Sequence, residues 1–568
     1  MTDSRKTDAP SEAQRWAQLK SDILEAATSL GIDSIGFASA DPFTTLKDRL
    51  IAHRAKGYES GFEEKDLDKR VTPALLFDRP KSIIAIAVAY PSKLVDPPKS
   101  EPGAYRGILA RSSWGRDYHH VLRDRLRRLE AFIAERVPEA RMESMVDTGA
   151  LSDRAVAERA GIGWSAKNCS IISPKLGSWI YLGEMITNIP FEPDTPVTEG
   201  CGECTKCIDA CPTNALVGPG QLNAQRCISY LTQTKGVLSD EFMTKIGNRL
   251  YGCDTCQIVC PENRGKNWTQ HPEMQPDPEI VKPLLIPLLS MSNKEYKAKF
   301  GDNSSSWRGK KPIQRNAIIA LGNFKDVTAV PHLHALMKED PRPELRITAA
   351  WALGKIGGQA SMEALEDMLH READSDVIAA IGQARAKLGQ HTTPLLYTEM
   401  DSPIGPLTVV RSMQGLCRIE FGAFADQEAS IQEWASRWYS EPELILNHAA
   451  MKDIVMQLQQ FFAGERKAFD LPLDMKGTPF QLQVWSALTE VPYGETWSYK
   501  QIAEWIGQPK AVRAVGGANN KNPVSVIVPC HRVIGMNGKM VGYGGGLDKK
   551  QILLALEQEN TDLPFVSK

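Results

Sequence analysis

Eight of the eleven cysteines in this chain of 568 residues lie between residues 201 and 260. The run CGECTKCIDACP has the spacing C-x2-C-x2-C-x3-C-P, YGCDTCQIVCP ends in C-x2-C-x3-C-P, and one more cysteine lies between them. Three thiolates on one turn can grip one face of a four-iron cubane, while the cysteine before each proline points toward a neighbouring cluster. This pattern predicts two 4Fe-4S clusters and disfavours zinc. The expected ligands are Cys201, Cys204, Cys207 and Cys260 for one cluster and Cys211, Cys227, Cys253 and Cys256 for the other.

A second candidate site lies in VPCHRVIG, residues 528–535, where Cys530 and His531 are adjacent. A thiol of pKa about 8.5 becomes a nucleophile when a base draws off its proton. His531 can be that base, and Glu557 can orient the imidazole as the third member of a triad. Neighbouring side chains of a strand point to opposite faces, so we expect the pair on a turn, with Pro529 breaking the strand before it. For such a dipeptide taken alone, a buried inert thiol is the alternative.

The elements that would position these residues begin with an amphipathic helix over residues 11–30. Strands are predicted at SIGFAS (34–39) and SIIAIAVAY (82–90), the second apolar enough to be buried on both faces. A charged helix follows at 117–136, then a strand at RMESMVDT and a helix around SDRAVAERAG. This alternation indicates an α/β domain that extends to about residue 199.

An internal repeat occupies residues 310–390, where RNAIIALGNF and TAAWALGKIG place a Leu-Gly step at Leu321 and at Leu353. Paired helices rich in Ala and Leu are typical of a small HEAT-like α-solenoid, although the period is short; two unrelated helix pairs are the alternative. A linker is expected at 388–394, separating folds with independent cores. Basic residues that could contact phosphates at the start of the repeats, or merely be solvated, are Arg308, Lys310, Lys311 and Arg315.

The composition is that of a folded chain, with 42% hydrophobic and 24% charged residues. No apolar run approaches the ~20 residues that span a bilayer, and no signal peptide is recognisable, so we expect a cytoplasmic protein without a membrane partner. In that compartment cysteines serve as metal ligands or reactive thiols rather than disulfides. The net charge of -2 hides a contrast: residues 394–475 carry 6 Lys+Arg against 12 Asp+Glu, and residues 476–550 carry 9 against 4. The basic segment is where nucleic acid would bind.

These features predict a multidomain chain of α/β and α+β units. The expected domains are residues 1–199 (α/β), 200–265 (ferredoxin-type with two clusters), 266–392 (HEAT-like helical repeats), 393–475 (α/β) and 476–568 (helix-turn-helix and the Cys-His motif).

Further motifs are WGRDYHHVLRDRL, VDTGALSDRAVAERAGIGWSAKN, RCISYLT in the ferredoxin block, and GNRLYGCDTCQ. They closely resemble epoxyqueuosine reductase, the cobalamin-dependent enzyme that completes queuosine in transfer RNA, over roughly residues 15–390. The resemblance implies a cobalamin-binding domain at 1–199, two clusters, and reduction of an epoxide on the wobble base to an alkene. It also implies that Asp147 of VDTG is the proton donor, although Ala150 and Leu151 stand where proline-containing variants are common.

The implied chemistry accounts for the parts. Cob(I)alamin is a nucleophile strong enough to open an epoxide, and forming it demands the low-potential electrons that the clusters supply from an external donor. The opened oxygen leaves as water, so burial beside the corrin could raise the pKa of Asp147 and keep it protonated, with a strand-end cap as its alternative role. No D-x-H-x-x-G motif is present, since Asp117-Tyr118-His119 is followed by Leu122, and we expect base-off cobalamin.

Candidate cobalamin contacts in stretches that match the family are Arg70, Lys167, Asn168, Ser229 and Asp254. The alternative for this half is a reductive dehalogenase-like corrinoid enzyme. Such enzymes usually carry a twin-arginine export signal, and none is recognisable here.

The stretch from residue 478 to 557 contains TPFQLQVWSAL, VPYGETWSYKQIAEWIG, AVRAVGGANNKNP, VSVIVPCHRVIG and GYGGGLDKKQILLALE. These motifs resemble methylated-DNA-protein cysteine methyltransferase, a resemblance that covers about residues 395–560. It implies that Cys530 irreversibly accepts the alkyl group of O6-alkylguanine in double-stranded DNA. The alternative is a binder that recognises alkyl lesions without repairing them, but such proteins lack the cysteine.

SYKQIAEWIG and AVRAVGGANN read as a helix-turn-helix whose second helix can approach a groove closely. The small residues that would permit this are Ala511, Ala514, Gly516, Gly517 and Ala518. An alkylated base must be flipped out of the duplex to meet a thiol.

The family pattern assigns roles in this flipping: Arg513 fills the gap in the stack, Tyr499 crowds the phosphate and Asn522 forms a hinge. Tyr543 walls the pocket and donates toward the leaving guanine, while Gly544 replaces the family's serine and removes one hydrogen bond to O6. We expect the chain to act as a monomer on its transfer RNA and DNA substrates.

Overall fold

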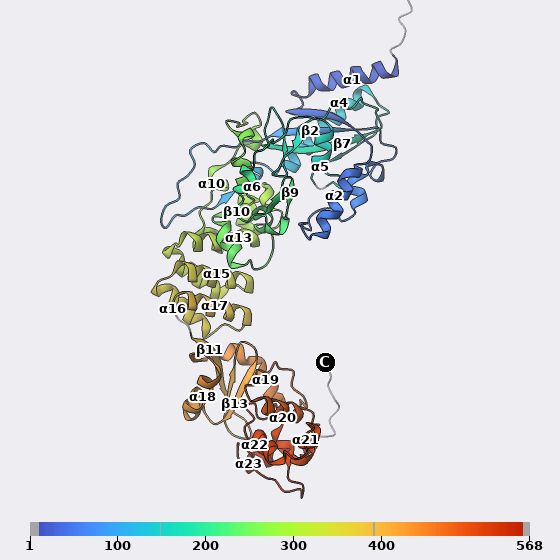
Figure 1. Cartoon of the computed structure of the whole chain (residues 1–568). Helices are drawn as coiled ribbons and strands as arrows, with labels where there is room; N and C mark the ends of the chain where they lie inside the picture. The colour runs from blue at the N-terminus through green and yellow to red at the C-terminus, as the bar shows by residue number, and fades with distance from the viewer. Residues whose placement is uncertain (1–10, 148, 390–391, 561–568) are drawn as a thin grey trace, which may run out of the picture. The chain divides into compact units, whose positions relative to one another are not determined.

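The computed structural model describes residues 11–147, 149–389 and 392–560. The chain forms two compact units, Met1–Leu333 and His334–Lys568, and the boundary falls inside helix α14 (Val330–Glu339). Each unit is described by itself (Figure 1). Among the described residues, no helix has the length and apolar character needed to cross a membrane.

The first unit contains a four-stranded sheet of order β1-β2-β7-β4 in which every pairing is antiparallel. Its strands are β1 (Ser34–Ser39), β2 (Ser82–Ala89), β7 (Ile180–Thr187) and β4 (Met142–Met145). As the apolar run predicts, all of β2 is buried, because its alternate residues join two cores. One core includes helices α1 (Glu12–Ala26) and α4 (Tyr118–Arg136), and the other includes α5 (Asp153–Arg159).

The predicted helices and strands of this region are therefore confirmed, with α1 ending four residues before the expected boundary at residue 30. The first unit also contains two further helices of more than ten residues and many short helices and strands. They are α2 (Thr44–Ala55), α3 (Leu67–Val71), β3 (Ile108–Leu109), β5 (Trp164–Ser165), β6 (Ile171–Ile172), α6 (Lys206–Asp209), β8 (Leu216–Gly218), β9 (Gln221–Leu222), α7 (Ile228–Leu231), α8 (Asp240–Ile246), β10 (Arg249–Tyr251), α9 (Thr255–Ile258), α10 (Pro278–Val281), α11 (Ile286–Ser290), α12 (Asn293–Phe300) and α13 (Lys310–Phe324).

The second unit begins with helices α15 (Pro343–Ile356), α16 (Gln359–Leu369) and α17 (Ser375–Lys387), which pack on one another. The glycine of the repeated Leu-Gly step has a packing role here. A Cβ at Gly354 would lie 3.0 Å from the Cβ of Ala384, so the glycine lets α15 and α17 approach closely.

A second four-stranded sheet follows, of order β13-β12-β11-β14. Its strands are β11 (Thr393–Met400), β12 (Leu407–Arg411), β13 (Leu416–Phe421) and β14 (Pro442–Leu446), and the helices beside it are α18 (Phe424–Trp438) and α19 (His448–Phe462). The C-terminal region is mostly helical, with α20 (Pro479–Thr489), β15 (Trp497–Ser498), α21 (Tyr499–Trp505), α22 (Val512–Asn520), β16 (Val533–Ile534) and α23 (Leu547–Glu559).

Polar contacts join the helical repeats to this sheet domain on either side of the expected linker. The fully buried side chain of Asn447 donates through Nδ2 to the carbonyl oxygens of Leu369 and Glu372, at 2.7 and 2.9 Å. Its Oδ1 caps α19 by accepting from the amide of Ala450. The folds on either side of 388–394 are therefore joined by buried hydrogen bonds as well as by the chain.

Candidate functional sites

The eight clustered cysteines are half-buried and unpaired by disulfides. Their thiols interact electrostatically in two groups. Cys207 and Cys260 each lie in the field of Cys201, and Cys207 also in that of Cys204; Cys227 lies in the field of Cys211 and Cys253. Most of these interactions lie within the two expected ligand sets, but Cys256 also senses Cys207. The division of the cysteines between two clusters therefore stays a prediction.

The electrostatics of these thiols fit a cationic metal cluster. Burial, reinforced by neighbouring thiols, raises the pKa of Cys227 to about 11. At Cys227 the chain without metal therefore disfavours the thiolate, which bound iron would neutralise. At Cys211, although burial opposes the charge, hydrogen bonds from backbone amides and Thr213 lower the pKa. Backbone amides also point at sulfur: Lys167 N lies 3.5 Å from Cys201 Sγ and Ala215 N lies 3.2 Å from Cys211 Sγ.

Asp147 follows β4 in the left-handed region, with φ at 51°. Its carboxylate accepts a hydrogen bond from Tyr118 Oη at 2.6 Å and lies 3.4 Å from His119 Nε2. The side chain is 61% exposed, and the hydrogen bonds of His119 and Tyr118 keep the pKa of Asp147 below its ordinary value. In the structure the carboxylate is open and stabilised as an anion. The expected rise in the pKa of Asp147 concerns burial beside the corrin and stays a prediction.

A proton is nevertheless stored beside this carboxylate. Burial disfavours the charged ring of His119, but its hydrogen bonds with Asp117 and Asp147 raise the pKa of His119 to about 9. His119 Nδ1 lies 2.7 Å from Asp117 Oδ1. At neutral pH the imidazolium therefore lies against the predicted proton donor.

Two buried carboxyl groups lie beneath the Asp147 loop. Asp153 Oδ2 accepts a hydrogen bond from the amide of Asp147 at 3.0 Å. Burial and the charge of Asp147 raise the pKa of Asp153 to about 6, and burial raises the pKa of Glu184 well above its ordinary value. The pair did not emerge from the sequence, although a glutamate within the apolar strand IYLGEMIT was a signal for it.

Stacked tyrosines run from the Asp147 site toward the cysteines. The ring of Tyr118 stacks on Tyr181 at 4.5 Å, and Tyr181 packs on Tyr90 at 4.3 Å between centroids. Tyr90 in turn lies within the field of Cys256. The predicted proton donor and one group of cluster ligands therefore belong to one continuous site.

The five candidate cobalamin contacts have different surroundings in the structure. Lys167 Nζ donates to the carbonyl of Gly202, Asn168 is buried near the carbonyl of Cys256, and Ser229 follows Cys227 by two residues. Arg70 is half-buried and makes no ion pair with any residue that the structure describes. Asp254 is committed elsewhere, because it forms a buried ion pair with Arg111 at 3.0 Å.

Of the basic residues expected to contact phosphates at the repeats, Arg315 is buried, whereas Arg308, Lys310 and Lys311 are partly exposed and their role stays a prediction. Arg315 is only 2% exposed and donates to backbone carbonyls of Leu231 and Thr234, so its proposed phosphate contact is wrong. Lys310 Nζ donates to the carbonyl of Met291. Arg308 stacks on two exposed aromatic rings, Phe62 and Trp307.

In the second unit, Cys530 begins a 3-10 turn, Cys530–Arg532, after Pro529, as the sequence predicts. His531 Nε2 lies 2.7 Å from Glu557 Oε1, and both side chains are buried. Arg532 contacts the same carboxylate, at 2.9 Å from Oε2, and is a member of the site that sequence reasoning missed. The signal was its place directly after the Cys-His pair.

The charges in this site favour a neutral base beside a protonated thiol. Burial raises the pKa of Cys530, and burial lowers the pKa of His531 despite the opposing effect of Glu557. Although burial works against it, hydrogen bonds from His531 and Arg532 lower the pKa of Glu557 to about 2. His531 Nδ1 is buried without a hydrogen-bond partner among the described residues, so this nitrogen is free to accept a proton.

The other predicted groups lie around Cys530. Tyr543 is buried with its hydroxyl group facing Cys530 and Ser525. Asn522 Nδ2 donates to the carbonyl of Val528 at 2.8 Å and closes the loop before the turn. Tyr499 Oη donates to the carbonyl of Val541 at 3.0 Å.

The predicted helix-turn-helix corresponds to α21 and α22, which pack together. Arg513, Ala514 and Gly517 are exposed on α22, whereas Ala518 is buried and its carbonyl accepts from Trp485. Ala518 therefore packs in the core and does not face a groove. Two of the cations counted in the basic segment, Arg532 and Lys550, are likewise buried.

Family models match five stretches of the chain. They are "Epoxyqueuosine reductase QueG, DUF1730" at residues 70–148, "4Fe-4S double cluster binding domain" at 200–263, "HEAT repeats" at 308–386, and "6-O-methylguanine DNA methyltransferase" as its ribonuclease-like domain at 395–475 and its DNA binding domain at 479–559. The HEAT-like repeats and both methyltransferase domains are thereby confirmed.

Known proteins resemble the first two thirds of the chain closely. The epoxyqueuosine reductase of Bacillus subtilis (strain 168) is 64% identical over 359 residues, which cover 63% of this chain and 93% of that protein. A crystal structure of epoxyqueuosine reductase with a tRNA-Tyr epoxyqueuosine-modified stem loop is 62% identical with a TM-score of 0.64, covering 66% of this chain and all of that one. The enzyme from Streptococcus thermophilus has 43% identity and a TM-score of 0.63 over the same shares. The homologues support an oxidoreductase activity, the methyltransferase domains support a transferase activity, and the dehalogenase-like alternative is set aside.

Proposed function

Because the chain belongs to the epoxyqueuosine reductase family, we propose that residues 1–392 reduce epoxyqueuosine at the wobble position of transfer RNA to queuosine, and that residues 393–568 transfer alkyl groups from O6-alkylguanine in DNA to Cys530. The first activity uses cobalamin and two 4Fe-4S clusters. The second uses no cofactor. The domain limits expected from the sequence serve as the working division of the two activities.

The reductase proposal rests on the contact between Asp147, Tyr118 and His119 beside the cluster cysteines. Conversion of an epoxide to an alkene consumes two electrons and two protons and releases water. The clusters, when bound, would supply the two electrons from a low-potential donor, and the oxygen needs two protons to leave as water. His119, with its pKa of about 9, holds a proton that it passes to the ionised carboxylate of Asp147, and Asp147 delivers this proton to the oxygen. The second proton comes from solvent.

Cobalamin, when bound, would supply the reduced nucleophilic metal centre that attacks the epoxide carbon. Arg70, Lys167, Asn168 and Ser229 are the residues proposed to hold it, since Lys167 and Asn168 contact the cysteine segments and Arg70 makes no ion pair among the described residues. The tyrosine stack Tyr118, Tyr181 and Tyr90 excludes water between the proton donor and the clusters.

The reductase experiment uses anaerobically purified full-length chain with cobalamin, a low-potential reductant and an anticodon stem loop that carries epoxyqueuosine. Nucleoside mass spectrometry should show a loss of one oxygen atom from the modified base. Failure of the cobalamin-loaded, iron-replete chain to convert the stem loop would refute the assignment. The reaction is placed in the cytoplasm, where transfer RNA is modified and eight cysteines can remain cluster ligands.

The alkyltransferase proposal rests on the buried contact of His531 with Glu557, one residue after Cys530. His531 draws the proton from Cys530, a bond forms from Sγ to the alkyl carbon, and the bond from that carbon to guanine O6 breaks. Tyr543 donates a proton toward the leaving guanine, and Glu557 stabilises the imidazolium that has formed. A thioether is a poor leaving group, so the transfer happens once per chain.

The alkyltransferase experiment treats the full-length chain with duplex DNA containing O6-methylguanine. Mass spectrometry of its peptides should find one methyl group, a gain of ~14 Da, on Cys530 only. Cys530→Ala should remove the transfer and retain DNA binding, because the phosphate contacts lie elsewhere. Cys417→Ala, at the other buried thiol of this half, is the matched control and should transfer normally. Transfer beyond one equivalent, or methylation of another residue, would contradict the mechanism.

A further inference from the structure

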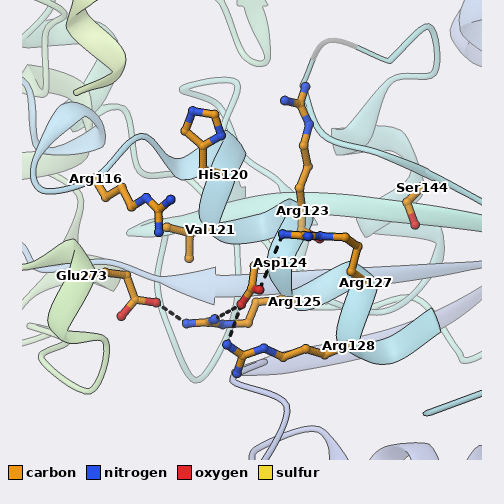
Figure 2. Close-up of a pocket in the computed structure, with 10 residues that line it drawn as sticks. All are labelled: Arg116, His120, Val121, Arg123, Asp124, Arg125, Arg127, Arg128, Ser144 and Glu273. Atoms are coloured by element: carbon orange, nitrogen blue, oxygen red, sulfur yellow. Dashed lines mark hydrogen bonds and ion pairs between the residues drawn. The ribbon is translucent and has the colours of Figure 1, made fainter. Parts of the chain in front are cut away.

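An arginine-lined cavity of about 720 Å³ lies along helix α4 in the first unit, outside the site described above. Five arginines line it: Arg116, Arg123, Arg125, Arg127 and Arg128, together with His120 and two carboxylates. Figure 2 shows these side chains around the exposed side of the helix. Cations exceed anions by three among these residues before His120 is counted, which is a strong local excess in a chain of net charge -2.

The two carboxylates are largely used to fix one arginine. Arg125, whose side chain is 9% exposed, forms ion pairs with Asp124 and Glu273. Asp124 also lies 2.7 Å from Arg128. Asp124 also lies 3.7 Å from Arg127, so this carboxylate partly neutralises three arginines. Arg116, Arg123 and Arg127 are nevertheless exposed to solvent.

Three of the exposed side chains that line the cavity, one histidine and two arginines, share one face of the helix. His120, Arg123 and Arg127 follow at i, i+3 and i+7, so they lie in a row with roughly 10 Å of helical rise from first to last. Arg127 is 73% exposed. Arg116 precedes the helix and makes no ion pair within the part of the chain that the structure describes. A row of guanidinium groups at this spacing suits a row of phosphates, which arginine binds through paired hydrogen bonds.

The cavity lies on the helix and the strand that position the proposed catalytic carboxylate. Its lining includes Ser144 of β4, three residues before Asp147, and its helix carries Tyr118 and His119, which contact Asp147. A polymer whose reacting base lies at Asp147 must lead its backbone past one edge of this site. The phosphate surface expected in the helical repeats includes a buried residue, Arg315, whereas the α4 cavity is open.

We propose that the arginine row on α4 binds the sugar-phosphate backbone of the RNA strand that carries the reacting base. The inference rests on the proposed reductase function. The cavity recognises the negative charge of a phosphodiester. The nucleotide tail of cobalamin also carries one phosphate. The RNA strand is the proposed occupant because a row of separated cations matches a chain of phosphates rather than a single one.

The test compares Arg123→Gln/Arg127→Gln with Arg15→Gln/Arg79→Gln, a control that removes two exposed arginines from the same unit and changes the net charge equally. Binding of an unmodified anticodon stem loop to the full chain is measured by fluorescence anisotropy over a range of salt concentrations. The α4 variant should bind about 10- to 100-fold more weakly at low salt, and its slope of log affinity against log salt should fall by about 1.5. The control should stay within about twofold of the wild type, and iron content and cobalamin binding should be unchanged in both.

Wild-type affinity and salt slope in the α4 variant would overturn the inference. So would a loss of cobalamin binding with RNA binding intact, because the cavity would then serve the cofactor tail. The reductase assignment fails separately, if the wild-type chain binds the stem loop and cannot reduce its epoxyqueuosine form. In the reductase assay the α4 variant should raise KM with kcat nearly unchanged, since the contact is made equally before and during the reaction.

Discussion

The guanidinium of Arg385, at the end of α17, forms two hydrogen bonds with the carboxylate of Glu443 in β14, at 3.0 and 3.2 Å. The arginine side chain is 3% exposed, and Thr392 donates to the same carboxylate. Together with Asn447, this pair joins the helical repeats to the alkyltransferase sheet within the second unit. A change in the helical repeats can therefore reach the sheet domain through these buried polar groups.

Removing this arginine should destabilise the second unit. Arg385→Met keeps the apolar stem and removes the charge, which leaves Glu443 to be solvated, at a loss of about 1–3 kcal/mol. For a unit of this size the melting temperature should fall by about 2–4 °C per kcal/mol. The measurement is the temperature at which half of the methyl-acceptor capacity is lost. Arg371→Met, at an exposed ion pair with Asp367, is the control and should shift it little.

Single cysteine replacements should remove one cluster at a time. Cys260→Ser should lower the iron content from about eight to about four atoms per chain by removing the cluster on the first three cysteines, and Cys227→Ser should remove the other. Iron analysis and electron paramagnetic resonance of the reduced protein distinguish the two. Cys169→Ser is the control, because this thiol belongs to neither group. Zinc in place of iron would contradict the whole assignment.

Asp147→Asn should abolish epoxide reduction and leave the cofactors in place, because the amide keeps the shape and lacks the acidic proton. The backbone N–H of residue 147 can still donate to Asp153 Oδ2, so the loop keeps this hydrogen bond. Absorption spectra of clusters and corrin check cofactor binding, and single-turnover conversion of the stem loop checks the chemistry. Full turnover by this variant would remove Asp147 from the mechanism.

The reductase rate should fall as pH rises through about 9. His119 has a raised pKa, so it is protonated below that value and loses its proton above it, and Asp147 then has no adjacent source for the proton that it donates. His119→Gln should lower the rate at neutral pH and remove this alkaline limb. If the rate of the His119→Gln variant still falls near pH 9, the alkaline limb of the pH profile belongs to another group.

Acid should destabilise the alkyltransferase site. Glu557 has a pKa of about 2 in the folded chain against an ordinary value of 4.5, so its carboxylate contributes stability above pH 4.5 that is lost as pH falls through 2. The shift corresponds to roughly 3 kcal/mol. The lowered pKa of His531 acts in the same direction, because only the unfolded chain takes up its proton below pH 6.5.

Glu557→Gln should therefore be less stable than the wild type at pH 7, and the difference should shrink in acid. Tryptophan fluorescence during denaturant unfolding follows the loss. Glu559→Gln, two residues further along α23 and exposed, is the control and should follow the wild type at every pH. A constant difference between Glu557→Gln and the wild type from pH 7 to pH 3 would contradict the role of the carboxylate.

Regular patterns made most of the architecture predictable. The apolar run of β2, the Leu-Gly step of the repeats and the spacing of the cysteines each report a local constraint, and local constraints are legible in a sequence. The turn at Cys530 was predictable for the same reason. Burial that depends on distant segments could not be predicted from the sequence. Arg315 and Ala518 were expected at the surface and Arg532 was counted among the basic residues of the nucleic-acid-binding segment, but all three are buried.

The environment of Asp147 shows the same limit. Its carboxylate lies beside His119 because a helix and a loop some 30 residues apart in sequence converge, and no local pattern encodes that approach. The direction of its pKa shift depended on this contact, as did the discovery of the carboxyl pair beneath the loop. A pKa shift caused by a group that is distant in sequence can be predicted only when the positions of both groups in the fold are known.

The burial of Cys530 also determines how long the protein remains usable. A residue that acts once must survive until its lesion arrives, and thiols in cells are consumed by oxidants and small electrophiles at a rate set by exposure and thiolate content. Cys530 is 3% exposed and its pKa is raised, so both factors are small. The burial that requires a damaged base to leave the helix in the proposed transfer therefore also protects the unreacted thiol of Cys530 from oxidation and alkylation.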